Sequence, residues 1–137
     1  MSETLETVGI SDLRDREIAT LSGGQKQKVA IAAILAMRPR VLVLDEPTAA
    51  LDPASSTLVF ETLREANRTL GITIVVVEQK VALLSEYCNR VLVLNHGEIA
   101  LQGEPHEVFA HTDELRAIGV DCPRVTRIFN SLEADGW

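Results

Sequence analysis

The chain has 137 residues, of which 46% are hydrophobic, and a formal net charge of −7. This length suits one ordinary domain with a buried core, and the acidic balance argues against a nucleic-acid partner, which would require a basic face. The longest apolar run, residues 29–37, is far shorter than the ~20 residues that cross a membrane. We expect no secretory signal from the N-terminal residues, and the isolated Cys88 and Cys122 fit a reducing cytosol.

The first predicted helix follows a polar segment, residues 1–20, whose charged cluster at 13–17 is typical of a surface turn. Ser22 has the character of a helix N-cap, and Gln25 stands three residues later, so the two form a capping-box pattern. The helix is expected to continue through the alanine-rich run and to end before Pro39.

A short aliphatic strand, residues 41–44, comes next and ends in two carboxylates. Because it shows no polar alternation, we predict that it is buried on both faces, as strands of parallel sheets are. Asp52 and Pro53 then mark the start of a second helix. Its core-facing stripe consists of Val59, Leu63, Ala66 and Leu70, and Gly71 ends it.

The remaining elements continue this alternation of strands and helices. We predict strands at 72–77 and 90–94, a helix at 81–87, a hairpin turn at 95–97 that leads into 98–102, short helices at 105–110 and 113–118, and an amphipathic segment at 125–132. Strands that alternate with helices indicate an α/β fold with a mostly parallel sheet. The sequence contains no internal repeat or linker.

The residues Ser22, Gly23 and Gly24 open the first helix, where free backbone N–H groups and the helix dipole favour an anion. Two glycines would let an oxyanion approach the backbone closely. The alternative is that Ser22 and Gln25 only cap the helix.

Carboxylates follow the first strand directly, at Asp45 and Glu46. The carboxyl ends of parallel strands are where α/β proteins bind ligands, so one carboxylate could hold Mg²⁺ through water and the other could orient or deprotonate an attacking water. The alternative is an acidic surface turn before Pro47. Asp52 could be only a helix cap, and Gln79, which should lie level with Glu46, is uninformative alone.

Together these motifs resemble the ABC-transporter ATPase family in order and spacing. The resemblance rests on L-S-G-G-Q at 21–25, V-L-V-L-D-E-P at 41–47, A-L-D-P at 50–53, and a strand followed by a polar residue at 79. The sequence that flanks the motifs is most similar to that of energy-coupling-factor ATPases, which serve importers of vitamins and of cobalt or nickel ions. Residues 115–127 also resemble the C-terminal extension of that subfamily.

The resemblance implies a role for each motif. The signature residues that would contact the γ-phosphate of ATP bound to the opposite subunit are Leu21, Ser22, Gly23, Gly24 and Gln25. In the Walker B strand, Asp45 would be the Mg²⁺-linked residue and Glu46 the catalytic carboxylate. Asp52 would belong to the D-loop at the dimer interface. The implied cofactors are ATP and Mg²⁺.

Two features depart from the family pattern. No G-x-x-x-x-G-K-[ST] phosphate loop occurs in the 137 residues, since none of the eight glycines is followed by Lys. Gln79 stands where the family has a switch histidine, and glutamine can donate a hydrogen bond but cannot carry a proton near pH 7. We therefore expect weak or absent ATP binding by this chain alone.

The expected fold is a partial P-loop NTPase fold: a mostly parallel sheet flanked by helices, without the phosphate-loop strand and the N-terminal β-subdomain. Residues 1–137 would form the C-terminal part of an ABC ATPase domain. Residues 1–40 would be the end of the helical subdomain with the signature helix, 41–110 the core from Walker B to the switch position, and 111–137 the C-terminal extension. A missing strand would leave unpaired edges in the sheet, which we expect to close by rearrangement, by strand exchange in a homodimer, or by pairing with another chain.

Three hypotheses of function follow from the sequence. In the first, the chain is an ATP-hydrolysing transporter subunit that needs a second ATPase subunit or a chain with the phosphate loop. It would then lie in the cytoplasm, bound to membrane transporter subunits at the inner or plasma membrane. In the second, it is a non-catalytic module that lends its signature motif to a partner ATPase. In the third, it is a fragment without independent biology.

Overall fold

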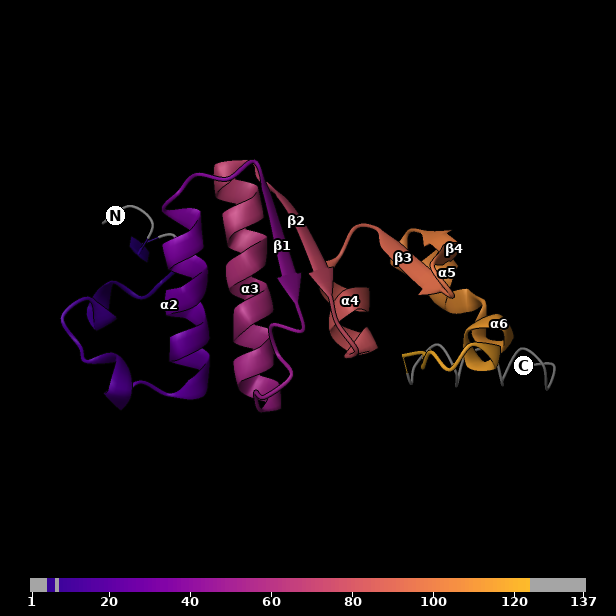
Figure 1. The fold of residues 1–137 in the computed structure, drawn as a ribbon, viewed down its shortest axis with the longest axis horizontal. Helices are drawn as coiled ribbons and strands as arrows, with labels where there is room; N and C mark the ends of the chain where they lie inside the picture. Colours follow the sequence, from indigo (N-terminus) through magenta and orange to yellow (C-terminus); the bar gives the residue numbers. More distant parts are fainter. Residues whose placement is uncertain (1–4, 7, 124–137) are drawn as a thin grey trace. The chain divides into compact units, whose positions relative to one another are not determined.

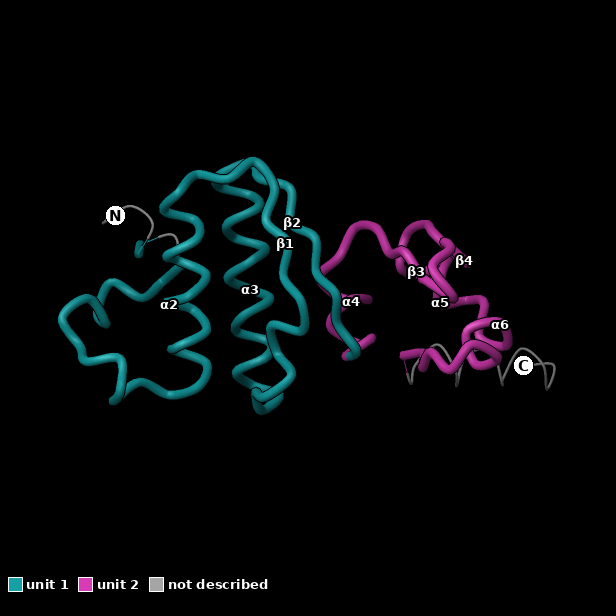
Figure 2. Tube along the Cα trace, viewed as in Figure 1, with its two compact units in different colours: residues 1–79 teal, residues 80–137 magenta. Residues whose placement is uncertain are grey.

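The computed structural model describes residues 5, 6 and 8–123 of the chain. It divides into two units, residues 1–79 and 80–137, which are described separately (Figure 2). The predicted amphipathic segment at 125–132 lies outside the described residues. No helix in the described part is both long enough and apolar enough to span a membrane.

The first unit is built from two helices and two parallel strands. Two 3-10 turns, Ser11–Leu13 and Ile18–Thr20, precede α2 (Gly23–Leu35), β1 (Val41–Asp45), α3 (Pro53–Leu70) and β2 (Thr73–Val77). The strands pair in parallel, from Val41 opposite Thr73 to Asp45 opposite Val77, with α3 as the crossover between them. The two helices lie side by side (Figure 1). The predicted parallel arrangement is thus present as the β1–β2 pair.

The signals that begin and end the helices act largely as predicted. The Gln25 N–H donates to Ser22 Oγ at 3.3 Å, and the Ser22 N–H donates to Gln25 Oε1 at 2.9 Å, which confirms the capping box. Helix α2 ends at Leu35, with Ala36 as its C-cap, and so stops short of Pro39. Gly71 closes α3 in the left-handed conformation, with φ of 64°.

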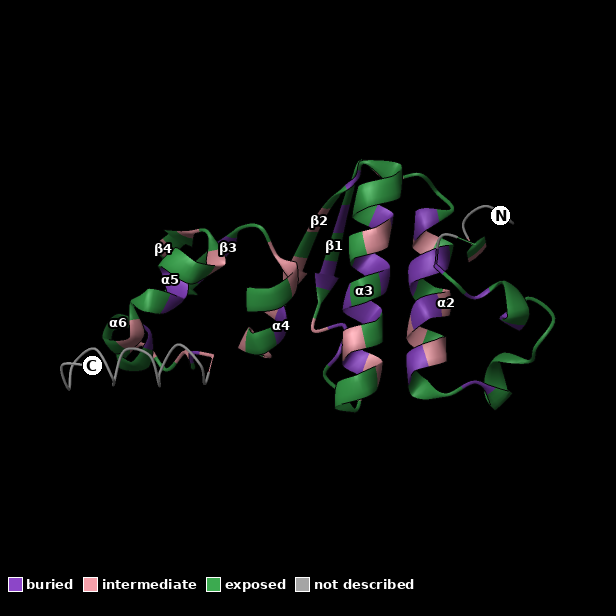
Figure 3. Ribbon diagram, turned by 180° about the vertical axis from the view of Figure 1, so that it is seen from behind, coloured by how far each residue is buried: buried purple, intermediate pink, exposed green. Residues whose placement is uncertain are grey.

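The core of the first unit lies between the helices and one face of the sheet. It is formed by aliphatic side chains of both helices, of β1 and of the residue before β2, among them Ile31, Leu35, Leu42, Leu44, Val59, Leu63, Ala66 and Ile72. The buried stripes of α2 and α3 are visible in Figure 3. The predicted stripe of α3 is buried at Val59, Leu63 and Ala66, but Leu70, in the last turn, is 41% exposed.

The other face of the β1–β2 sheet is exposed, so the prediction that the first strand is buried on both faces is wrong. Along β1 the side chains alternate, with Leu42 and Leu44 buried but Val41 and Val43 exposed by 54% and 65%. On β2, Val75 and Val77 are likewise exposed. Helix α3 packs against the β1–β2 pair and α2 packs against α3. The described residues of this unit leave the valine face exposed.

One ammonium group is buried in the first unit. Lys28, on α2, is only 9% exposed, and its burial lowers the pKa of its side chain. The negative charges of Glu61 and Asp12 act in the opposite direction and raise this pKa. These two carboxylates therefore offset part of the cost of burying the charge.

The second unit is a hairpin packed with short helices. Its elements are α4 (Val81–Tyr87), β3 (Val91–Asn95), β4 (Glu98–Gly103), α5 (Pro105–Ala110) and α6 (Thr112–Ala117). Strands β3 and β4 pair antiparallel, with an irregularity between Val93 and Leu94, which confirms the predicted hairpin. His96 and Gly97, with φ of 50° and 85°, form its turn. The core of this unit includes Val91, Val93, Val108, Phe109, Leu115 and Cys122.

Candidate functional site

The predicted site residues gather at one end of the first unit. In a chain that alternates helices with parallel strands, the carboxyl ends of the strands and the amino ends of the helices point the same way. Figure 1 shows β1 and β2 pointing toward the end of the unit at which α2 and α3 begin. The structure arranges the site residues there in two groups.

The first group joins the start of α2 to the start of α3. An added Cβ on Gly23 would lie 3.4 Å from Leu51 Cδ2, and one on Gly24 would lie 3.1 Å from both Cβ and Oγ of Ser55. The two glycines therefore let the helices approach closely. This packing role and the capping role of Ser22 explain the motif structurally, and its proposed contact with a phosphate remains a prediction.

Asp52 caps the start of α3, as predicted from the sequence. The Ser55 N–H donates to Asp52 Oδ1 at 3.0 Å, and the Ser55 hydroxyl donates to Oδ2 at 2.6 Å. The Ser55 hydroxyl, and next the Ser55 N–H, lower the pKa of Asp52. Asp52 thus stays ionised beside the helix terminus, and its role in an interface between subunits remains a prediction.

The second group joins Glu46 to Gln79. The Glu46 N–H donates to the Val77 carbonyl at 2.8 Å, which extends the parallel pairing beyond β1. The Gln79 side-chain amide donates to Glu46 Oε1, so these residues lie level, as predicted. Glu46 has a φ of 44°, a left-handed conformation that is strained for a residue with a side chain.

Two further residues complete this group, and sequence reasoning missed them. Thr48 is fully buried, and its hydroxyl donates to Glu78 Oε2 at 2.5 Å. Glu78 Oε1 accepts the N–H of Gln79 at 3.0 Å. The sequence did contain a signal for this pair: Glu78 is a carboxylate directly after the second strand, and Thr48 is a hydroxyl residue in the loop after the first strand.

Asp45 is the last residue of β1 and lies on the exposed side of the sheet, opposite Val77. No cluster of three or more His, Cys, Asp or Glu side chains suited to a metal occurs among the residues the structure describes. Mg²⁺ commonly uses only one or two protein carboxylates, with water and substrate phosphates as its other ligands. The oxygen donors of Asp45 and Glu46 are of the kind that fits this ion.

The arrangement limits what the site can do chemically. Glu46 is a carboxylate and can accept a proton from a water molecule, while Gln79 can donate a hydrogen bond to it but cannot exchange a proton. Within this bonded pair, therefore, only Glu46 can take part in proton transfer.

Comparison with known proteins shows which family this chain resembles. The model of the ABC transporter family matches residues 1–49. The chain is 40% identical over 136 residues to the energy-coupling factor transporter ATP-binding protein EcfA1 of Clostridium perfringens, covering 99% of this chain and 48% of that protein. It is 45% identical over 138 residues to the EcfA1 of Symbiobacterium thermophilum, covering 99% of this chain and 47% of that protein.

A solved structure supports the same assignment. The fold is similar to cbiO1 from Clostridium perfringens, described as part of the ABC transporter complex cbiONQ, with a TM-score of 0.77 and 40% identity. The match covers 94% of this chain and 51% of that one. The chain therefore spans about half the length of the relatives it matches. Its motifs, fold and relatives together resemble those of the ABC transporter ATPase family, and its fold matches part of the ATPase domain.

Proposed function

We propose that this chain contributes the signature helix, the Walker B strand and the D-loop of the ATP-hydrolysing subunit of an energy-coupling-factor transporter. The observation that carries the proposal is the gathering of these motifs at one end of the first unit, with Gln79 bonded to Glu46. The relatives with 40–45% identity are named as ATP-binding proteins of such transporters, which supports the same role.

In this role Glu46 takes a proton from the water that attacks the γ-phosphate. The water oxygen bonds to the γ-phosphorus, and the bond from that phosphorus to the bridging oxygen breaks, so that ADP leaves. Gln79 orients the Glu46 carboxylate through its amide, and Asp45 would hold Mg²⁺ through water. The ion neutralises phosphate charge when it is bound. At the start of α2, Ser22 and the backbone of Gly23 and Gly24 bind the γ-phosphate of ATP on the opposite subunit, because helix amino ends favour anions.

The phosphate loop must come from elsewhere, since these 137 residues contain no G-x-x-x-x-G-K-[ST] motif. We propose that another chain, or another part of the same polypeptide, supplies it. A second ATPase subunit and membrane subunits would complete the transporter, with this chain at the cytoplasmic face of the inner or plasma membrane. The related cbiO1 is described as part of such a complex.

The exposed valine face of the β1–β2 sheet supports pairing with further polypeptide. In the absence of a natural partner, a homodimer could pack these faces together, and strand exchange between its subunits could pair the outer edges of the two-stranded sheet. Light scattering of the purified chain over a range of concentrations tests this proposal, and a monomer throughout that range would contradict it.

Titration of ATP–Mg²⁺ by calorimetry, with and without a phosphate-loop chain, tests the nucleotide proposal. We expect negligible binding to the 137 residues alone, and binding with hydrolysis in the mixture. Glu46→Gln should then reduce hydrolysis by about 10²–10⁴-fold, as loss of a general base does. Tight ATP binding to the isolated chain would refute the need for a second loop.

A second candidate function is a non-catalytic module that lends its signature helix to a partner's ATP site. It is favoured by Gln79, since an amide replaces a proton-carrying side chain beside Glu46. In this case Glu46→Gln would leave the hydrolysis of the mixture unchanged, while Ser22→Ala would lower it. In the first function, both substitutions lower it.

A further inference from the structure

We infer that Glu78 is a positioning residue that fixes the Glu46–Gln79 pair by holding the two loops that carry it. The inference deepens the proposed function, because these are the groups assigned there to water activation. It rests on the contacts of one carboxylate and on the burial of its partner Thr48.

Both oxygens of the Glu78 carboxylate are engaged by different segments of the chain. Oε2 accepts the Thr48 hydroxyl at 2.5 Å. Oε1 accepts the Gln79 N–H at 3.0 Å. The Glu78 side chain, directly after β2, thus bonds both the loop after β1 and its own neighbour, Gln79.

Thr48 gives this bridge a fixed anchor. Its side chain is fully buried, with 0% of its surface exposed, so its hydroxyl bonds inside the protein rather than to bulk water. Only the buried Pro47 separates Thr48 from Glu46. Holding Thr48 against Glu78 therefore restricts where the Glu46 side chain can lie.

Glu46 needs such restraint because its backbone is strained. Left-handed conformations of residues with side chains persist only where surrounding contacts over-determine them. Here the contacts include the Glu46 N–H bond to Val77, the Ala49 N–H bond to the Glu46 carbonyl, and the Thr48–Glu78 bridge on the other side of Pro47. Gln79 is held through its own N–H, which leaves its side chain directed at Glu46.

The bridge predicts which substitutions keep the geometry. Glu78→Gln can preserve it, since the amide oxygen accepts from Gln79 and the Thr48 hydroxyl can turn to accept from the amide nitrogen. Glu78→Ala removes both bonds. Thr48→Ser keeps the hydroxyl, whereas Thr48→Val keeps the shape and loses it.

The test measures hydrogen exchange of the Gln79 side-chain amide by NMR on the ¹⁵N-labelled full chain. The signal is assigned by its absence from Gln79→Glu, and Glu46→Ala gives the value without the bond. We expect Glu78→Ala and Thr48→Val to speed exchange about fivefold to tenfold toward that value, as loss of one hydrogen bond implies. Glu78→Gln and Thr48→Ser should stay near the native rate.

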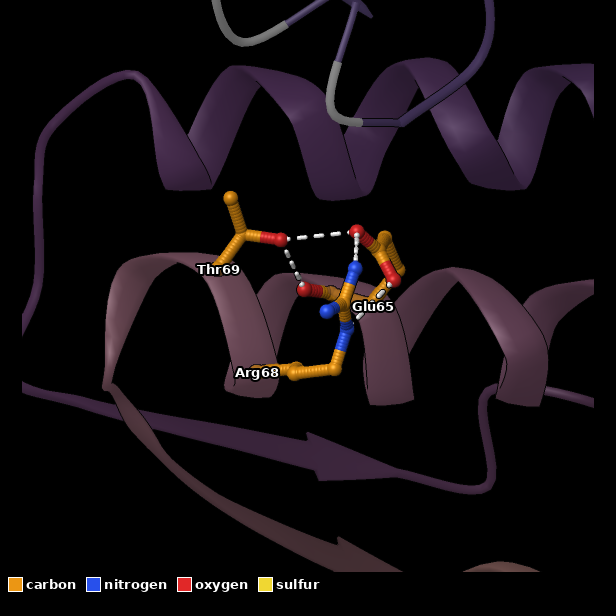
Figure 4. Close-up of polar contacts among 3 residues, drawn as sticks. All are labelled: Glu65, Arg68 and Thr69. Carbon is orange, nitrogen blue, oxygen red and sulfur yellow. Dashed lines mark hydrogen bonds and ion pairs between the residues drawn. The ribbon is translucent and has the colours of Figure 1, made fainter.

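Glu65 provides a matched control on α3. Its carboxylate also accepts a threonine hydroxyl, from Thr69 at 2.9 Å, and pairs with Arg68 at 2.8 Å (Figure 4). Glu65→Ala should leave the Gln79 signal unchanged. The inference is overturned if Glu46→Ala moves the Gln79 amide but Glu78→Ala and Thr48→Val do not, or if Glu65→Ala moves it equally.

The comparison of Thr48→Val with Thr48→Ser leaves Glu78 intact, so it tests the bridge even where Glu78→Ala fails to fold. The readout requires no ATP turnover. A chain that never hydrolyses ATP, with or without a partner, would refute the proposed function while leaving this test of Glu78 intact.

Discussion

Substitution of Gly24 by alanine tests the close packing of α2 on α3. In a helix, alanine is favoured over glycine by about 1 kcal/mol. The new Cβ, however, would lie 3.1 Å from Cβ and Oγ of Ser55, inside the roughly 3.5–4.0 Å optimum for such contacts. The hydroxyl can rotate away, but the Ser55 Cβ is fixed on α3, so we assign about 2 kcal/mol to overpacking.

The net expectation is a loss of about 1 kcal/mol in the free energy of unfolding. With a typical urea dependence of about 2 kcal/mol per molar, the midpoint should fall by about 0.5 M. Urea titration followed by circular dichroism measures it, and hydrogen exchange of the α2 and α3 amides localises the effect to the first unit.

Gly23→Ala is the matched control, because its Cβ would meet Leu51 Cδ2 at 3.4 Å, an ordinary contact. Its midpoint should be unchanged or higher. Ser55→Gly removes the atoms that clash, so the Gly24→Ala penalty should shrink in that background. A Gly24→Ala chain as stable as the native one, or a penalty that persists with Ser55→Gly, would refute the reasoning.

Three further predictions concern the core, the α3 cap and the switch position. The Leu35 side chain is 1% exposed, so Leu35→Ala should lower the free energy of unfolding, measured by urea titration, by about 2–5 kcal/mol. Leu70 is 41% exposed, so Leu70→Ala should lower it far less. Similar losses for the two variants would contradict the packing. Because the pKa of Asp52 is lowered in the fold, its charge stabilises fully above the ordinary aspartate pKa of about 3.9, and this contribution disappears as pH falls through the lowered value. Asp52→Asn should therefore weaken the pH dependence of the urea midpoint in that range, and an unchanged profile would count against the cap. In the Gln79→His variant the imidazole should have a pKa above about 6.5, because the nearby Glu46 carboxylate would stabilise its cation. An NMR titration that gives a lower pKa would show that the side chain at position 79 does not contact Glu46.

The local signals in the sequence predicted the helix boundaries well, because caps depend on residues within a turn of one another. Ser22 with Gln25 is such a signal, and so are Asp52 and Gly71. The level placement of Gln79 and Glu46 was also predictable, since strand ends of a parallel pair meet at one edge.

Burial was harder to predict, because it depends on what covers a surface rather than on the residues of that surface. The unbroken aliphatic run of β1 indicated two buried faces, yet Val41 and Val43 are exposed. The Thr48–Glu78 bond joins residues 30 positions apart through one rotamer of each. The left-handed backbone of Glu46 has no sequence signal, because glutamate is not a residue that favours it.

That backbone conformation at Glu46 sets stability against activity. Glycine would adopt a φ of 44° without strain, and asparagine tolerates it better than glutamate does. A search for stabilising substitutions would therefore select Glu46 for replacement and would discard the carboxylate. Engineering of this chain for higher stability should hold position 46 fixed and look for its gains elsewhere.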